Sequence, residues 1–282
     1  MSRRVGVCAW IYGDATLEET CARIAAAGYD GVEIPGEPER WPAATLRRQL
    51  AAAGLTPVGL TASCGFPATR RDLAHPDPGI RRDAVRYVED CLRWAAEIGA
   101  PLVQMLPSGE SRLAPLATRE QEWAWSVAAM QEACREAARC SVRISIEPLN
   151  RYEAYLVTST ADALAYLGAV GSPWVGMTVD CFHANLEEPD IAASMCAAGP
   201  HLWHLHVADT NRRGLGEGHL DLASIGGALD AIGYRGAVVL EVMPPGPDPF
   251  QSIKGPDSPA ILDGYLRESL PRLRAHLGMP HA

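Results

Sequence analysis

The segment RISIEPLNRYE, residues 143–153, joins a short apolar run to a group of polar side chains. Its first half is typical of a buried strand, and Pro148 ends that strand because proline has no N–H to donate to a neighbouring strand. The strand therefore finishes in a carboxylate, Glu147, which Asn150 and Glu153 soon follow. A charged residue at the end of an apolar run indicates either a polar surface turn or the rim of an active site.

Strand-like runs of this kind alternate with helix-like segments along the whole sequence. Apolar runs predict eight strands, at residues 5–10, 31–35, 56–62, 101–106, 142–147, 174–180, 202–207 and 237–242. Helical periodicity, several times ending at the glycine expected just beyond a helix, is found at residues 16–28, 43–54, 77–99, 119–139 and 222–233. Eight strand–helix units in 282 residues predict an α/β fold, a single (β/α)8 barrel domain over residues 1–282.

A doubly wound parallel sheet is the main structural alternative, since it also alternates strands with helices. That fold places a glycine-rich phosphate loop after its first strand, whereas CAWIYGDAT (residues 8–16) contains no GxGxxG motif. The Pro/Gly-rich stretch at residues 244–259 is followed by only one further predicted helix. We interpret it as a long loop at the barrel rim and not as a linker between domains.

Composition limits the class of partner. The net charge of −9 disfavours a nucleic-acid backbone or an anionic membrane, because the protein's field would repel both. The eight cysteines are scattered without CxxC pairs, which is typical of reduced thiols and not of a disulfide framework. No apolar run approaches the roughly 20 residues of a membrane span, and the N-terminus lacks a signal-peptide pattern. We therefore expect a cytoplasmic protein that acts on a small molecule.

Four consecutive predicted strands, the fifth to the eighth, carry metal-ligand side chains at or near their ends: Glu147, Asp180, His206 and Glu241. In a (β/α)8 barrel the active site lies at the carboxyl ends of the strands, so these side chains would meet there. Burying ionised carboxylates costs several kcal/mol unless they are paired or bind a metal. Three carboxylates with one imidazole suit one divalent cation, Mn²⁺ with Mg²⁺ or Co²⁺ as alternatives, better than a structural zinc.

Further polar residues surround this predicted site. His204 precedes His206 by two positions and shares its face, one layer deeper in the barrel. We interpret His204 as a packing residue or a support for a ligand, with direct ligation as the alternative. In the loops that follow the strands, Arg212 is a candidate contact for a substrate oxygen, and His219 is a weaker one.

With these residues assembled, the chain resembles the sugar isomerase/epimerase superfamily with the xylose-isomerase-like barrel. It is most similar to the ketose 3-epimerases that act on D-tagatose, D-psicose or L-ribulose. The segments that carry the resemblance are IEPLNRYE, VDCFHANLEE, HLHVADTNRRGLGEGHLD and VVLEV (residues 146–153, 179–188, 204–221 and 238–242).

The resemblance implies roles for individual residues. It makes Glu147, Asp180, His206 and Glu241 the ligands of the cation, with Glu147 and Glu241 also flanking the sugar carbon that inverts. Residues that match the family's sugar contacts are Glu153, His183 and Arg212. A looser match near the amino end places Trp10, Glu33 and Cys64 in the substrate pocket, with Cys8 and Gly65 beside them.

The predicted reaction is inversion at C3 of a ketose through a cis-enediolate, with Glu147 and Glu241 as the acid and the base. The GxGH motif at residues 216–219 is shared with hydroxypyruvate isomerase and inosose dehydratase relatives, so three alternatives stay open. They are an aldose–ketose or hydroxypyruvate isomerase, an inosose dehydratase or C-glycoside-cleaving lyase, and a non-enzymatic sugar-binding barrel that retains the metal. Apolar outer helices and the Trp123/Trp125 pair indicate a homodimer or homotetramer, or simple packing of that segment on the barrel.

Overall fold

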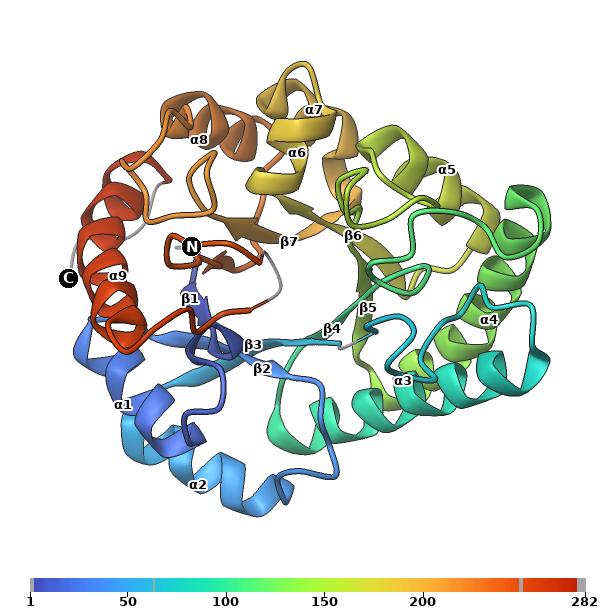
Figure 1. Ribbon diagram of the computed structural model, residues 1–282, viewed down its shortest axis with the longest axis horizontal. Coiled ribbons are helices and arrows are strands. Elements are labelled where there is room, and N and C mark those ends of the chain that lie inside the picture. The colour runs from blue at the N-terminus through green and yellow to red at the C-terminus, as the bar shows by residue number, and fades with distance from the viewer. Residues whose placement is uncertain (1–2, 63, 249–250, 278–282) are drawn as a thin grey trace.

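The computed structural model describes residues 3–62, 64–248 and 251–277, and its centre is a closed barrel of parallel strands (Figure 1). The strands follow one another around the barrel in chain order, and β1 pairs with β8 to close it. Their bounds are β1 Val5–Cys8, β2 Gly31–Pro35, β3 Thr56–Thr61, β4 Leu102–Met105, β5 Arg143–Ile146, β6 Val175–Asp180, β7 Leu202–Val207 and β8 Val238–Leu240. The predicted (β/α)8 barrel is therefore confirmed.

Helices surround the barrel on its outer side, as Figure 1 shows. They are α1 Leu17–Ala26, α2 Ala43–Ala53, α3 Pro78–Ile98, α4 Arg119–Cys140, α5 Thr160–Val170, α6 Cys181–Glu187, α7 Ile191–Ala198, α8 Leu222–Ala231 and α9 Ser258–His276, with short 3₁₀ helices η1 Ala9–Tyr12 and η2 Gly199–His201. Capping boxes start two of them: Thr16 with Glu19 at α1 and Thr118 with Gln121 at α4. None of the described helices is both long and apolar enough to cross a membrane.

The strands are buried on both faces, as expected when parallel strands lie between a barrel interior and a helical layer. All six residues of β6 are buried, and so are all four of β4. One pair of polar groups inside the barrel is formed by the hydroxyls of Ser145 and Thr178, which lie 2.8 Å apart. The strands therefore form a rigid frame whose carboxyl ends hold the loops described below.

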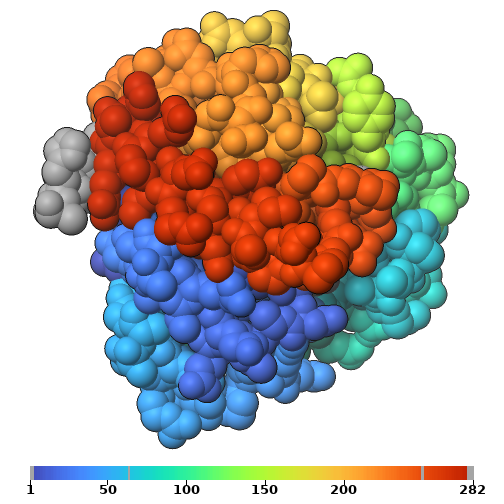
Figure 2. Space-filling model, turned by 60° about the vertical axis from the view of Figure 1, so that its left-hand side comes forward, coloured from blue at the N-terminus to red at the C-terminus, as the bar shows by residue number. Residues whose placement is uncertain are grey.

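Two predicted boundaries differ from the structure in ways that affect the site. Trp10 was expected at the end of the first strand but lies in η1, because the chain turns into a 3₁₀ helix directly after Cys8. Glu147 and Glu241 lie one residue beyond β5 and β8, not within them. The described residues of the Pro/Gly-rich segment after β8 form a loop at the barrel rim, as predicted. Figure 2 shows the C-terminal part of the chain as a band on the surface, between the N-terminal part and the region of α8.

Candidate active site

Four side chains converge at the carboxyl ends of neighbouring strands. Asp180 is the last residue of β6 and lies beside His206 of β7 in the strand register, while Glu147 and Glu241 follow β5 and β8. One potential ligand atom of each lies within 4.8 Å of the corresponding atoms of the other three. All four side chains are buried. The structure thus brings together the four residues that the sequence predicts as metal ligands.

The electrostatic environment of these residues is uneven. Burial raises the pKa of Glu147, with a further contribution from Glu241. Burial also opposes ionisation of Glu241, but the positive charges of Arg212 and His206 outweigh it and hold the Glu241 pKa well below its usual range. For His206, burial disfavours the imidazolium, yet Glu241 and Glu33 raise its pKa well above the usual value. The cluster therefore favours positive charge at its centre.

Arg212 connects the loops after β6, β7 and β8. Its guanidinium forms an ion pair with Asp180, and its Nη2 lies 2.9 Å from Oε2 of Glu241. The same guanidinium lies over the ring of Phe182, 4.9 Å from the centroid. Arg212 has φ +65°, and its carbonyl accepts a hydrogen bond from the N–H of Met243 at 2.7 Å. The loop thus directs the guanidinium toward two predicted metal ligands and into the cavity.

His183 lies in the first turn of α6, which Asp180 caps by accepting a hydrogen bond from Phe182 N–H at 2.7 Å. The N–H of Asn150 donates to Nδ1 of His183 at 3.3 Å, so Nδ1 is an acceptor and the ring proton lies on Nε2. That Nε2 is 3.7 Å from Oδ2 of Asp180. The side-chain amide Nδ2 of Asn150 also donates to Oε1 of Glu153 at 2.8 Å. Asn150 therefore orients both His183 and Glu153.

A cavity of about 800 Å³ opens above these residues. It is lined by six of the predicted site residues: Trp10, Glu147, Glu153, His183, Arg212 and Glu241. Part of its wall is the loop after β8, residues 244–248, which Lys254 braces: its Nζ donates to the carbonyls of Gly246, Pro247 and Asp248 at 3.1, 3.0 and 2.8 Å.

The carboxylates of Glu147 and Glu241 each accept a hydrogen bond from a side-chain N–H. Nε1 of Trp10 donates to Oε1 of Glu241 at 2.9 Å. Nε2 of Gln104 donates to Oε2 of Glu147 at 2.5 Å. These contacts fix one oxygen of each carboxylate and leave the other directed toward His206, because Nδ1 of His206 lies 3.2 Å from Oε1 of Glu147 and 3.0 Å from Oε2 of Glu241.

Gln104 and Glu110 are among the cavity residues that were not identified from the sequence. Gln104 is a polar residue inside the apolar run of β4, and this placement could have identified it from the sequence. Glu110 lies in the loop after β4, where nothing in the local sequence distinguishes it. Burial, together with the charges of Glu153 and Glu147, raises the pKa of Glu110 to about 7. The cavity thus holds more carboxyl groups than the sequence predicts.

Two residues predicted to line the pocket lie elsewhere. Glu33 is fully enclosed, and its carboxylate contacts His204 and His206 below the cavity. Cys64 is also buried, and its thiol donates to the sulfur of Met105 at 3.7 Å. Neither is among the residues that line the cavity. Glu33 points into the barrel interior, whereas Cys64, in the loop after β3, packs against Met105.

A barrel of eight parallel strands with a cavity and an acidic cluster at their carboxyl ends defines the class of protein. Residues 21–260 match the family model of the xylose isomerase-like TIM barrel, so the chain belongs to this family. The resemblance seen in the sequence motifs is thereby confirmed.

The particular relatives are sugar epimerases. The chain is 31% identical over 225 residues to a D-psicose 3-epimerase of Ruminiclostridium cellulolyticum, which covers 78% of this chain and 75% of the relative. It is 33% identical over 233 residues to an L-ribulose 3-epimerase of Methylomonas sp., covering 80% and 78%. A crystal structure of D-psicose 3-epimerase with D-tagatose, from Clostridium cellulolyticum H10, matches with a TM-score of 0.87 at 25% identity and covers 97% of this chain and 99% of that one.

Proposed function

We propose that the protein is a divalent-cation-dependent ketose 3-epimerase that uses Mn²⁺, with Mg²⁺ or Co²⁺ as alternatives. The observation that carries the proposal is the convergence of Glu147, Asp180, His206 and Glu241 in one buried group beside the cavity. The relationship to D-psicose and L-ribulose 3-epimerases supports a sugar as the substrate.

The four residues fit the proposed cation. Carboxylate oxygens and an imidazole nitrogen are ligands that Mn²⁺, Mg²⁺ and Co²⁺ accept, and the cluster contains no thiolate that would favour a structural zinc. Three buried carboxylates are costly without positive charge nearby, and Arg212 alone contacts only two of them, Asp180 and Glu241. We infer that these four residues would hold the ion.

Glu147 and Glu241 are the proposed acid and base. They enter the site from β5 and β8, on either side of His206, and both line the cavity. One carboxylate removes the proton at C3 of the ketose, and the other returns a proton to the opposite face of that carbon, which inverts it. When bound, a divalent cation makes this C–H more acidic and stabilises the negative charge of the cis-enediolate.

The remaining cavity residues are proposed to bind and orient the sugar. Nε2–H of His183 and the guanidinium of Arg212 are donors that would bind sugar oxygens and polarise the carbonyl. The carboxylate of Glu153 would accept hydrogen bonds from hydroxyl groups. Trp10 would hold Glu241 through its indole N–H and cover part of the substrate. We do not extend this role to Glu33 and Cys64, because neither lines the cavity.

The test is to incubate the Mn²⁺-loaded protein in D2O with ketoses, aldoses, inososes and hydroxypyruvate and to follow exchange and products by NMR. Inversion at C3 with solvent deuterium at that carbon supports the proposal. Deuterium at C1 or C2 would instead assign an aldose–ketose or hydroxypyruvate isomerase, and an enone or diketone product would assign a dehydratase or lyase. Sugar binding without turnover would leave a metal-retaining sugar-binding barrel.

We also propose a homodimer or homotetramer, although the tryptophan pair gives this little support. Trp123 packs edge-on against Tyr166 at 5.3 Å, and Trp125 lies under the guanidinium of Arg81 at 4.7 Å, so both rings contact their own chain. Better support comes from three large apolar side chains exposed in the loops after β4 and β5: Leu113, Leu116 and Tyr152. Light scattering coupled to size-exclusion chromatography measures the mass that decides this, and a monomer at micromolar concentration would contradict it.

A further inference from the structure

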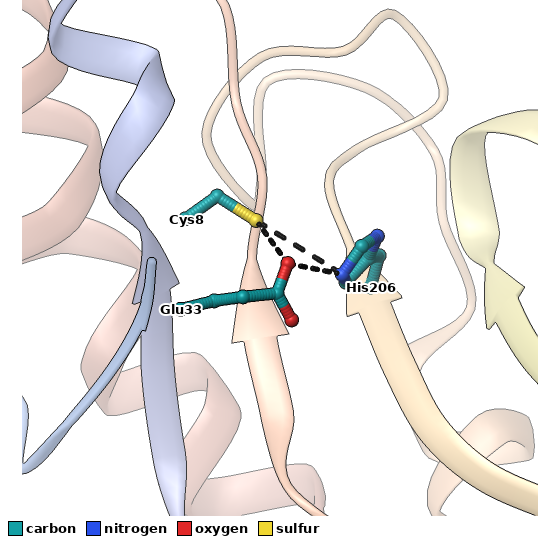
Figure 3. A group of neighbouring side chains, drawn as sticks. All are labelled: Cys8, Glu33 and His206. Atoms are coloured by element: carbon teal, nitrogen blue, oxygen red, sulfur yellow. Dashed lines mark hydrogen bonds and ion pairs between the residues drawn. The ribbon is translucent and has the colours of Figure 1, made fainter. Parts of the chain in front are cut away.

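Glu33 lies below His206, on the side that faces away from the cavity. Its side chain has no exposed surface, and its Oε1 is 3.0 Å from Nε2 of His206. The same oxygen accepts a hydrogen bond from the thiol of Cys8 at 3.3 Å. Figure 3 shows the Glu33 carboxylate between Cys8 and His206, with dashed lines to both. A buried carboxylate in this place needs a physical explanation, because its burial is costly.

The barrel is built to accommodate this carboxylate. Oε2 of Glu33 accepts a hydrogen bond from Nε2 of His204, and the hydroxyl of Thr61 donates to Oε1. Gly59 is the partner of Glu33 in the β2–β3 register, and a Cβ there would lie only 3.2 Å from Oε2 of Glu33. The absence of a side chain at position 59 thus leaves room for the carboxylate, which has a donor or a histidine on each oxygen.

The two ring nitrogens of His206 face different partners. Nδ1 is directed at Glu147 and Glu241, two of the predicted metal ligands, whereas Nε2 is directed at Glu33. A neutral imidazole carries one N–H and one lone pair, and the nitrogen beside a carboxylate that is not a metal ligand keeps the proton. A proton on Nε2 leaves the lone pair of Nδ1 pointing toward the cation site.

A second cation held by Cys8, Glu33 and His206 is the alternative explanation, since their potential ligand atoms also lie within 4.8 Å of one another. It would require both nitrogens of His206 to bind metal, which leaves the ring with no N–H. It would also displace the donors that Glu33 already has in Thr61 and His204. The hydrogen-bonded arrangement requires neither change, so the geometry favours it.

We propose that Glu33 is a positioning residue that holds His206 as the Nε2–H tautomer with Nδ1 free to bind the cation. The inference rests on the proposed metal site, and it replaces the substrate contact expected for Glu33 from the sequence. A carboxylate that supports a metal-binding histidine in this way typically changes metal affinity by about 10–100-fold when it is removed.

The test is calorimetric titration of Mn²⁺ into the metal-stripped full-length chain and into Glu33→Gln. We expect one Mn²⁺ per chain in both proteins, with Kd about 10–100-fold higher in the variant. Glu136→Gln is the matched control: Glu136 is also a buried carboxylate but lies on the outer helix α4, paired with Arg93, and its replacement should leave Kd within about twofold of wild type.

Cys8→Ser separates the two explanations of the cluster. A hydroxyl can still donate to Glu33, so we expect Mn²⁺ stoichiometry and Kd to stay close to wild type. Two ions per wild-type chain, falling to one in Cys8→Ser, would overturn the proposal in favour of a second metal. Wild-type Mn²⁺ affinity in Glu33→Gln would overturn the role proposed for Glu33 and leave the proposed function in place. A wild-type chain that binds no divalent cation would overturn the proposed function as well.

A measurement on the unaltered protein guards against a Glu33→Gln variant that does not fold. In the Mg²⁺-loaded, ¹⁵N-labelled wild type, long-range ¹H–¹⁵N spectra of the imidazole rings report which nitrogen of each histidine carries hydrogen. The His206 signals, assigned by their absence in His206→Gln, should show a proton on Nε2 and none on Nδ1. A proton on Nδ1 in the metal-loaded protein would contradict the proposal.

Discussion

At the carboxyl ends of the strands the barrel buries carboxylates, whereas near the amino ends of β6 and β7 a half-buried tryptophan ring packs against a glycine. We call the first region the mouth, made of Glu147, Asp180 and Glu241, and the second the floor, made of Arg143, Gly176 and Trp203. At the floor, the indole of Trp203 occupies the space that a Cβ on Gly176 would need, and Arg143 lies over it at 4.9 Å.

The two regions differ in what their packing achieves. The floor satisfies ordinary packing rules: a missing side chain on one strand is filled by a large ring from the next, where the register between β6 and β7 shifts. The mouth instead concentrates like charges that repel one another, an arrangement that costs stability and has value only if a cation or a reacting group uses it. Changes at the mouth should therefore affect turnover, and changes at the floor should affect folding.

The largest expected effect comes from removing the carboxylate of Glu241. Glu241→Gln keeps the side-chain shape but cannot accept or return a proton, so kcat for ketose epimerisation should fall by at least about 10³-fold, equivalent to roughly 4 kcal/mol. Thermal unfolding should show that the fold is retained. A Glu241→Gln enzyme with a tenth or more of the wild-type kcat would contradict the role of Glu241, and Glu136→Gln serves again as the control.

Removal of the cation should produce the next largest effect, a loss of stability. If the mouth binds Mn²⁺ only when folded, Mn²⁺ at about 100 times its Kd should raise the free energy of unfolding by roughly 2.7 kcal/mol over the chelator-treated protein. Chemical denaturation with and without Mn²⁺ measures this difference. Asp180→Asn should lose most of the increment. An equal increment in wild type and Asp180→Asn would place the ion elsewhere.

Gly176→Ala tests the floor. The added methyl overlaps the indole of Trp203, so the free energy of unfolding should drop by about 1–3 kcal/mol while Kd for Mn²⁺ stays near wild type. Gly168→Ala, in α5 with open space around it, is the matched control and should instead stabilise by about 0.4–1 kcal/mol. A loss of Mn²⁺ affinity in Gly176→Ala as large as its loss of stability would show that the two regions are not independent.

The contrast also explains which features could be predicted from sequence. Strand–helix alternation and the four residues at strand ends were predictable, because parallel strands bring their carboxyl ends to one place whatever the loops do. The contact of Glu33 with His206, on which its proposed supporting role depends, was not predictable, since His206 lies 173 positions away and nothing local distinguishes a buried glutamate from one that faces a pocket. Trp10 was predicted at the pocket, yet its 3₁₀ turn depends on tertiary packing beyond the reach of an apolar pattern.

The smallest expected effect is a pH dependence of stability that arises from Glu110, a cavity residue next to the mouth. In the folded protein the pKa of Glu110 is raised from 4.5 to about 7 by burial and by the carboxylates Glu153 and Glu147. Below about pH 4.5 Glu110 is protonated in both the folded and the unfolded chain, so it does not change the free energy of unfolding. As pH rises toward 7 the unfolded chain ionises freely and the folded chain does not, so the free energy of unfolding falls.

Glu110→Gln removes this penalty. In chelator-treated protein, we expect the variant to gain about 1–2 kcal/mol over wild type at pH 8 and little at pH 5, a value kept modest because Glu110 is partly exposed. Urea denaturation at the two pH values measures the difference, with exposed Glu217→Gln as the control for net charge. The same gain at both pH values would mean that burial and repulsion from Glu153 and Glu147 do not govern the ionisation of Glu110. A gain confined to pH 8 that vanishes on adding Mn²⁺ would tie that repulsion to the cation site, because a dication beside Glu147 would favour the ionised form of Glu110.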